Sequence, residues 1–110
     1  MMVTSDTKPQ LVEKYIQFAT QRYNINIDVV EVENGYEYNQ VEIPVGKFDY
    51  SGVVDALIQY KYPIDKMQAV INNYLLDATD AYAIEEFNKM QAWRKEAKEI
   101  AKEALTYGVS

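Results

Sequence analysis

The chain has no cysteine and no histidine among its 110 residues. Their absence excludes disulfides, thiol nucleophiles, zinc sites of the Cys/His kind and imidazole-based proton transfer near neutral pH. An enzyme would have to use carboxylates, lysines, tyrosines or hydroxyls. The four glycines, Gly35, Gly46, Gly52 and Gly108, are scattered, so the chain has no glycine-rich phosphate loop. Nucleotide hydrolysis and dinucleotide chemistry are therefore excluded, and we expect no cofactor and no small-molecule substrate.

Long apolar runs and an excess of basic residues are also missing. No segment approaches the eighteen or so apolar residues of a membrane span, and "MMVTSDTKPQ" lacks the features of a secretory signal. Seventeen acidic against eleven basic residues give a formal charge of -6, which would repel a phosphate backbone. We therefore expect no membrane partner and no direct nucleic-acid binding. A short run of Arg94, Lys95, Lys98 and Lys102 could still contact an acidic partner.

The remaining composition is that of a folded globular protein, with 48% hydrophobic and 25% charged residues. A chain of 110 residues suits one compact domain. We predict a flexible leader over residues 1–8 and a single α+β domain over residues 9–110. Its elements in order are an N-terminal helix, one β-hairpin and three helices, of which the last is long.

The N-terminal part carries two patterns. Leu11, Val12, Tyr15, Ile16 and Phe18 recur at helical spacing behind Pro9, which predicts a helix over residues 9–22. Next, "INIDVVEVENGYEYNQVEIPV" alternates apolar and polar residues around an Asn-Gly pair, the signal of a hairpin.

The hairpin register can be tested against the pattern. A loop of Glu33, Asn34 and Gly35 would pair Ile27 with Val41 and Ile25 with Ile43 on one face. Val32 and Val30 would meet Tyr36 and Tyr38 on the other, with Glu31 opposite Glu37. We prefer this register to a two-residue loop, which mixes polar and apolar side chains on both faces.

Three helices follow the hairpin. Asp49 or Ser51 can cap the first, "SGVVDALIQYKY", and Pro63 ends it. Pro63 also suits the first turn of the second helix, for which we expect a buried face of Ile64, Met67, Val70, Ile71, Tyr74 and Leu75. Thr79 or Asp80 can cap the last helix, which extends to about Leu105 or Tyr107. At about 1.5 Å per residue this helix is longer than a compact domain requires, so part of it can project.

Two clusters on the last helix are candidate sites. Glu85 and Glu86, near Asp77 and Asp80, could hold a divalent ion, but adjacent glutamates on a helix point about 100° apart and acids are common in a first helical turn. Trp93 lies in a stripe with Met90, Ala97 and Ile100 at three- and four-residue steps. Such a stripe forms a core or a helix–helix seam, in the same chain or with a neighbour.

The ten tyrosines are a second indication of protein contact, because tyrosine supplies contact area at low entropic cost. We take the candidate interface residues to be those of the hairpin face, the proline hinge and the long helix. They are Tyr36, Tyr38, Tyr62, Met90, Trp93, Arg94, Ala97 and Ile100.

The C-terminal two thirds resembles small proteins encoded by bacteriophages and prophages of gut Bacteroides-type bacteria. The resemblance rests on a helix start followed by an acidic loop and a second helix. The matching residues are Lys61, Tyr62, Pro63, Asp65, Met67, Ala69, Phe87, Met90, Gln91, Trp93, Arg94, Ala97 and Lys98. Such proteins are similar to virion structural or assembly components, which implies contacts with other phage proteins or with copies of itself, no catalysis, and a location in the virion or the bacterial cytoplasm. Two alternatives are a cytosolic adaptor or regulator and, more distantly, a carboxylate-dependent metal-binding enzyme.

Overall fold

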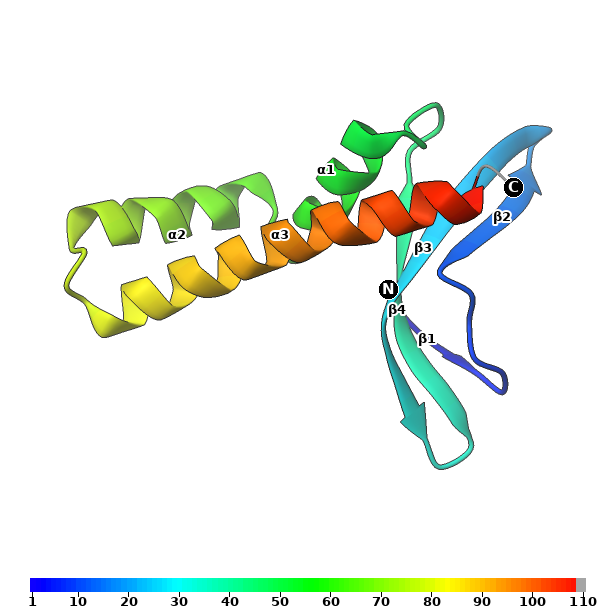
Figure 1. Ribbon diagram of the computed structural model, residues 1–110, viewed down its shortest axis with the longest axis horizontal. Coiled ribbons are helices and arrows are strands. Elements are labelled where there is room, and N and C mark those ends of the chain that lie inside the picture. The colour runs from blue at the N-terminus through cyan, green and yellow to red at the C-terminus, as the bar shows by residue number, and fades with distance from the viewer. Residues whose placement is uncertain (109–110) are drawn as a thin grey trace.

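The computed structural model describes residues 1–108 as a four-stranded antiparallel sheet followed by three helices (Figure 1). The elements are β1 (Met2–Ser5), β2 (Val12–Gln17), β3 (Thr20–Val32), β4 (Gly35–Ile43), α1 (Tyr50–Lys61), α2 (Ile64–Leu76) and α3 (Ala81–Gly108). The strand order is β1-β4-β3-β2, so the first two strands lie at opposite edges of the sheet. Residues 2–5, for which we predict a flexible leader, are thus the edge strand β1.

The predicted N-terminal helix over residues 9–22 is wrong, because these residues form β2 and the start of β3. Val12 and Ile16 are four residues apart, a spacing that fits both a helix and one face of a strand. The reversal occurs at Phe18 and Ala19, which have φ angles of 52° and 62°. Neither glycine nor asparagine marks this turn, so the sequence gives no signal for it.

The preferred hairpin register is also wrong. Val32 pairs with Gly35, Ile25 with Val41 and Ile27 with Asn39, and a bulge lies between Ile27 and Val30. The extra residue reverses the side-chain alternation of β3 at that point, which pattern reasoning with a uniform period cannot anticipate. The expected grouping is nevertheless confirmed, because the four aliphatic residues that we predict to share one face are all buried. They are Ile25, Ile27, Val41 and Ile43.

The three helices after the hairpin are confirmed. Asp49 caps α1 by accepting from the Gly52 amide at 2.7 Å, and α2 begins directly after Pro63. Asp80 caps α3, where its Oδ1 accepts from the amides of Tyr82 at 2.9 Å and Ala83 at 3.4 Å. Side-chain oxygens of this kind satisfy the unpaired amides of a first helical turn.

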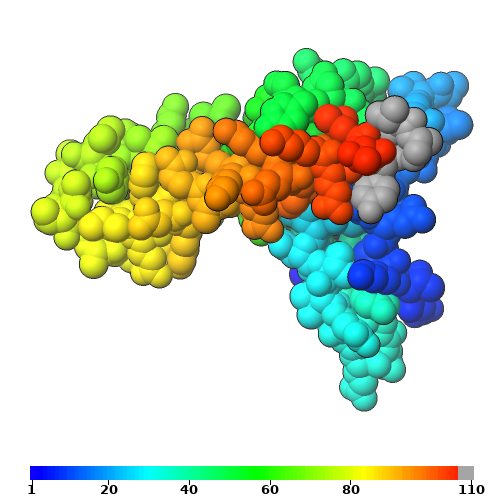
Figure 2. All heavy atoms as spheres, viewed as in Figure 1, coloured from blue at the N-terminus to red at the C-terminus, as the bar shows by residue number. Residues whose placement is uncertain are grey.

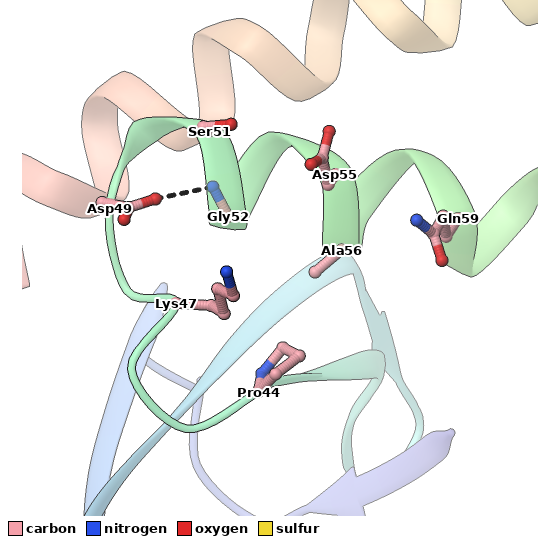
Figure 3. A pocket seen from close by; sticks show the side chains of 8 residues that line it. All are labelled: Pro44, Lys47, Asp49, Ser51, Gly52, Asp55, Ala56 and Gln59. Atoms are coloured by element: carbon pink, nitrogen blue, oxygen red, sulfur yellow. Dashed lines mark hydrogen bonds between the residues drawn. The ribbon is translucent and has the colours of Figure 1, made fainter.

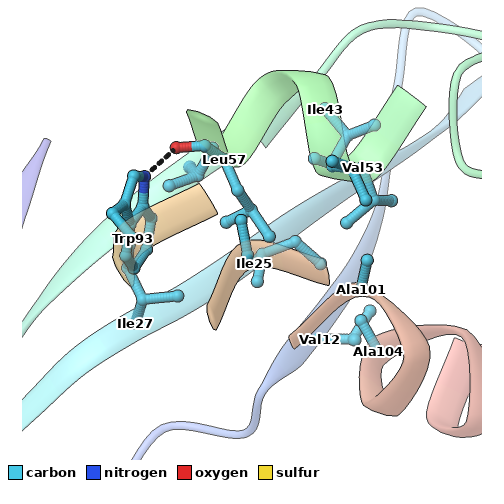
Figure 4. Close-up of a cluster of buried hydrophobic side chains, with 12 residues drawn as sticks. Val12, Ile25, Ile27, Ile43, Val53, Leu57, Trp93, Ala101 and Ala104 are labelled. Atoms are coloured by element: carbon cyan, nitrogen blue, oxygen red, sulfur yellow. Dashed lines mark hydrogen bonds between the residues drawn. The ribbon is translucent and has the colours of Figure 1, made fainter. Parts of the chain in front are cut away.

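One face of the sheet packs against α1 and the C-terminal half of α3 to form the core (Figure 4). The buried cluster consists of Val12, Ile25, Ile27, Val41, Ile43, Val53, Val54, Leu57, Trp93, Ala97, Ala101 and Ala104. The three alanines occupy every third or fourth position of α3, and their small side chains let the helix approach closely.

The opposite face of the sheet is crossed by the connection between β1 and β2. Asn26 points away from its neighbours Ile25 and Ile27, and its side chain donates to the Gln10 carbonyl at 2.8 Å and to Glu13 Oε1 at 3.0 Å. Gln40 donates to Glu13 Oε2 at 3.2 Å. Asn26 is only 2% exposed, and these bonds satisfy its buried amide.

The molecule is extended, because α2 and the N-terminal half of α3 project from the core as a helical hairpin (Figures 1 and 2). We call residues 64–90 the arm. The Cα radius of gyration is 16.1 Å, against about 13 Å for a compact chain of roughly 100 residues. No residue of the arm belongs to the core cluster.

Candidate protein-contact surface

The stripe predicted on the long helix is largely buried within the fold of the same chain. Met90, Trp93 and Ala97 are 0%, 5% and 0% exposed, and Trp93 Nε1 donates to the Leu57 carbonyl of α1 at 3.0 Å (Figure 4). Ile100 is partly buried against the same cluster. Arg94 is half-buried and donates to Gln91 Oε1 at 3.2 Å. The neighbour that Trp93 contacts is therefore α1 of the same chain.

A polar network joins Trp93 to the bulge of β3. The Lys61 ammonium lies 4.0 Å from the centre of the Trp93 ring, a cation–π contact. The same ammonium pairs with Asp28 Oδ2 at 3.0 Å, and Asn39 donates to that oxygen at 2.9 Å. Asp28 has a φ of 55° within the bulge. The network thus connects α3, α1 and the two central strands at the point where the arm begins.

The candidate tyrosines do not lie together. Tyr38 is 5% exposed and Tyr36 is half-buried. By strand alternation, both side chains lie on the sheet face opposite the one covered by the helices. Tyr62 packs against the core cluster, with the Lys66 ammonium 4.9 Å from its ring centre. The eight predicted interface residues therefore do not form one continuous exposed surface.

The carboxylates of the arm have local partners. Asp77 Oδ1 accepts from the Thr79 hydroxyl at 2.6 Å and from its amide at 3.0 Å, and these hydrogen bonds lower the pKa of Asp77 below its ordinary value. Lys89 pairs with Glu85 at 3.2 Å and lies 3.9 Å from Glu86. The hydrogen bond and charge of Glu85, followed by the charge of Glu86, raise the pKa of Lys89. Among residues 1–108, no three acidic side chains are grouped closely enough to hold a metal ion.

A shallow pocket of about 270 Å³ lies beside the start of α1 (Figure 3). Its lining consists of Pro44, Lys47, Asp49, Ser51, Gly52, Asp55, Ala56 and Gln59. Asp49 already serves as the helix cap, and Lys47 and Asp55 are exposed. The pocket therefore presents ordinary surface groups and no converging set of reactive side chains.

The arm carries the large exposed apolar side chains that the sequence-based prediction places in the core. Ile64 and Leu75 are 55% and 73% exposed, although they belong to the predicted buried face of α2. Leu76 and Tyr82 are 84% and 69% exposed at the far end of the arm. We call Leu75, Leu76 and Tyr82 the arm-tip patch.

The exposure arises because α2 has one helix to pack against. Val70 is its only buried residue, and Tyr74 stacks on the Phe87 ring of α3 with centroids 4.3 Å apart. The sequence does contain a signal for this: α2 has eight hydrophobic residues in thirteen, more than a single helix–helix seam can cover. Exposed clusters of this kind mark contact sites on soluble proteins.

Two further apolar surfaces lie on the sheet. Val30 and Val32 are 56% and 36% exposed where the β3–β4 hairpin extends beyond the helices. Ile16 and Phe18 are 73% and 93% exposed at the β2–β3 turn. No helix within the described residues is long and apolar enough to span a membrane.

No protein-family model matches the chain, and neither a curated protein nor a solved structure has significant similarity to it.

Proposed function

We propose that this protein is a non-enzymatic structural or assembly component that acts by contact with other protein chains, and that the arm is its main contact surface. The observation that supports the proposal is the arm-tip patch, in which three large apolar side chains are at least 69% exposed. Leaving such side chains in water is unfavourable, so a partner that covers them gains hydrophobic free energy. The arm also projects away from the core, so a second chain can reach its far end (Figure 2).

More specifically, we propose a component of a phage particle, of its head or its tail, as the sequence resemblance implies. Its partners would then be other phage structural proteins or copies of itself, in the virion or in the bacterial cytoplasm during assembly. A contact role suits a chain whose core is closed by α1 and the C-terminal half of α3. That core leaves the arm free to engage a neighbour.

Incorporation into particles tests this function. Particles purified from the host should contain the chain at a fixed ratio to the major structural protein, measured by quantitative mass spectrometry. Leu75→Glu should reduce its incorporation at least tenfold. Ile16→Glu is the matched control, because Ile16 and Leu75 are both 73% exposed and the same charge is introduced on the sheet side. Absence of the wild-type chain from purified particles would contradict the proposal.

A cytosolic adaptor is the second candidate, and the β3–β4 hairpin is the observation that favours it. Its exposed Val30 and Val32 lie on a projection separate from the arm (Figure 1). Two separate contact surfaces could bridge two partners. Recovery of the chain from the soluble fraction in a complex without particle proteins, sensitive to Val30→Glu as well as Leu75→Glu, would favour this alternative.

A further inference from the structure

We propose that the arm packs against the arm of a second copy, with the two α2 helices antiparallel, so that two arms form a four-helix bundle. This inference rests on the proposed function, because it identifies the chain itself as one of its partners. It assigns a specific occupant to the exposed side of α2.

The exposed side of α2 has the geometry of a helix-packing seam. Ile64, Ile71 and Leu75 are separated by seven and four residues, which places them within about 40° of one another around the helix. We call these three residues the α2 stripe. It runs for about 16 Å, at about 1.5 Å per residue. Ile71 is half-buried, whereas the two outer residues are more than half exposed.

The stripe lies beside the seam that α2 already makes with α3. That seam uses Val70, which is 8% exposed, and Tyr74, which stacks on Phe87. A helix with two apolar sides packs best between two neighbours, as in a four-helix bundle. The chain supplies one neighbour, α3, and the described residues place nothing over the other side. A second copy of α2 would present an identical stripe to it.

Charge selects the antiparallel orientation. The far end of the arm carries the exposed carboxylates Asp77 and Asp80. At its base, where α2 begins and α3 enters the core, the basic residues Lys66, Arg94 and Lys95 outnumber the acidic residues Asp65 and Glu96. In antiparallel arms each acidic end lies beside a basic end, whereas parallel arms would place like charges together. The same orientation brings Leu75 of one copy next to Ile64 of the other. The dipoles of the two α2 helices then point in opposite directions, which is favourable. A two-fold axis near the middle of α2 generates both contacts at once.

The size of the contact sets the expected affinity. A stable interface covers about 800 Å² on each partner, whereas the largest apolar patch of a typical monomer is roughly 300–600 Å². The α2 stripe contributes three apolar side chains on a helix of 13 residues, so this contact is smaller than a standard stable interface. We therefore expect dimerisation at roughly micromolar concentration.

Sedimentation velocity on the full chain from roughly 1 to 200 µM tests the association. The wild type should shift from monomer to dimer, and Leu75→Glu should weaken dimerisation at least tenfold. Ile16→Glu should dimerise like the wild type, and circular dichroism should show that both variants fold. A wild-type chain that is monomeric throughout would overturn the inference, as would dimerisation that only Ile16→Glu abolishes.

Orientation can be tested separately, because the chain contains no cysteine that would give a background reaction. A mixture of Ile64→Cys and Leu75→Cys proteins should cross-link through a short bismaleimide into a mixed dimer. Leu75→Cys alone should cross-link poorly, since antiparallel arms place its two copies about 16 Å apart along the bundle. Efficient cross-linking of Leu75→Cys alone would contradict the antiparallel arrangement.

Failure of this inference is distinguishable from failure of the proposed function. A monomeric chain that still enters particles in a Leu75-dependent manner would mean that another protein occupies the α2 stripe. That result overturns self-association and retains the assembly role. A dimer that never enters particles would retain self-association and overturn the assembly role.

Discussion

At the scale of single residues, Trp93 shows how a side chain typical of interfaces can serve the interior. Its ring fills the space between α1, α3 and the sheet, and its indole nitrogen bonds the Leu57 carbonyl at 3.0 Å. The buried ring and the satisfied N–H together fix the depth of α3 on α1. Variants of Trp93 therefore report on folding, and tests of assembly require other residues.

Two substitutions separate the contributions of this side chain. Trp93→Phe keeps most of the ring but loses the hydrogen bond, and we expect it to lower the free energy of unfolding by about 1–2 kcal/mol. Trp93→Ala also leaves a cavity and should cost about 3–5 kcal/mol. Urea unfolding at a concentration that keeps the chain monomeric measures both. Equal losses in the two variants would show that ring packing contributes little.

Gly52 is a residue at which a common stabilising substitution should fail. Replacing a helical glycine by alanine usually stabilises by about 0.5–1 kcal/mol. Here a Cβ would lie 2.0 Å from the Lys47 carbonyl oxygen and 2.8 Å from its carbon, so the loop before α1 must move. We expect Gly52→Ala to destabilise by about 1–3 kcal/mol.

The neighbouring Ser51→Ala serves as the control for Gly52→Ala. Ser51 is exposed in the same helical turn, and its replacement should change the free energy of unfolding by less than about 0.5 kcal/mol. Thermal unfolding of both variants shows whether Gly52→Ala stabilises or destabilises the folded state. A higher melting temperature for Gly52→Ala than for the wild type would mean that the loop accommodates the methyl group without cost.

At the scale of elements, the helices after the hairpin could be predicted because their ends carry explicit chemistry. Asp49, Pro63 and Asp80 cap or start a helix by rules that act within one turn. The candidate contact surface could be predicted only in part: apolar spacing identifies α2 as a packed helix but does not show how many neighbours it has. That number depends on tertiary structure, so Ile64 and Leu75 appear as core residues in the sequence.

The N-terminal strands could not be predicted for a different reason. The turn at Phe18 and Ala19 requires a left-handed backbone that these residue types seldom adopt, so local sequence preference and the observed structure conflict there. The bulge between Ile27 and Val30 likewise has no glycine to mark it. Long-range pairing with β3 and β4 overrides the local signal in both places.

The conflict at this turn predicts a stabilising double substitution. Changing Phe18 to Asn and Ala19 to Gly should raise the free energy of unfolding by about 1–2 kcal/mol, because these residues tolerate positive φ. Ala69→Gly is the control: Ala69 is exposed within α2, and the same change should there cost about 1 kcal/mol. Differential scanning calorimetry should show melting temperatures that move in opposite directions. A lower melting temperature for the turn variant would contradict the prediction.

The loop between α2 and α3 should respond to acid. The pKa of Asp77 is lowered by its bonds to Thr79, so its carboxylate stabilises the folded state above the ordinary pKa of an aspartate. This contribution is lost as the pH falls through the lower, folded-state pKa. Asp77→Asn keeps a side-chain acceptor but does not titrate. The stability difference between wild type and Asp77→Asn should therefore shrink as the pH falls through the ordinary pKa of an aspartate and below it, and a constant difference would contradict this.

At the scale of the whole molecule, the core and the arm are separable in their packing. The core cluster draws on the sheet, on α1 and on α3 from Trp93 onward, and contains no side chain of residues 63–92. The arm has its own small seam around Val70, Tyr74 and Phe87. Because the two seams share no residue, cooperative folding of the core does not require the arm.

Excision of the arm tests this separation. Because α2 and the start of α3 lie side by side as a helical hairpin (Figure 1), with axes roughly 8–10 Å apart, a short flexible linker can replace residues 66–89 and keep the buried Met90. We expect the shortened chain to fold with one cooperative transition, since the hydrogen bond and the packing of Trp93 remain. It should also lose both self-association and incorporation into particles. A shortened chain that unfolds without cooperativity would mean that the arm belongs to the folding unit, and a shortened chain that still dimerises would place the contact surface on the sheet.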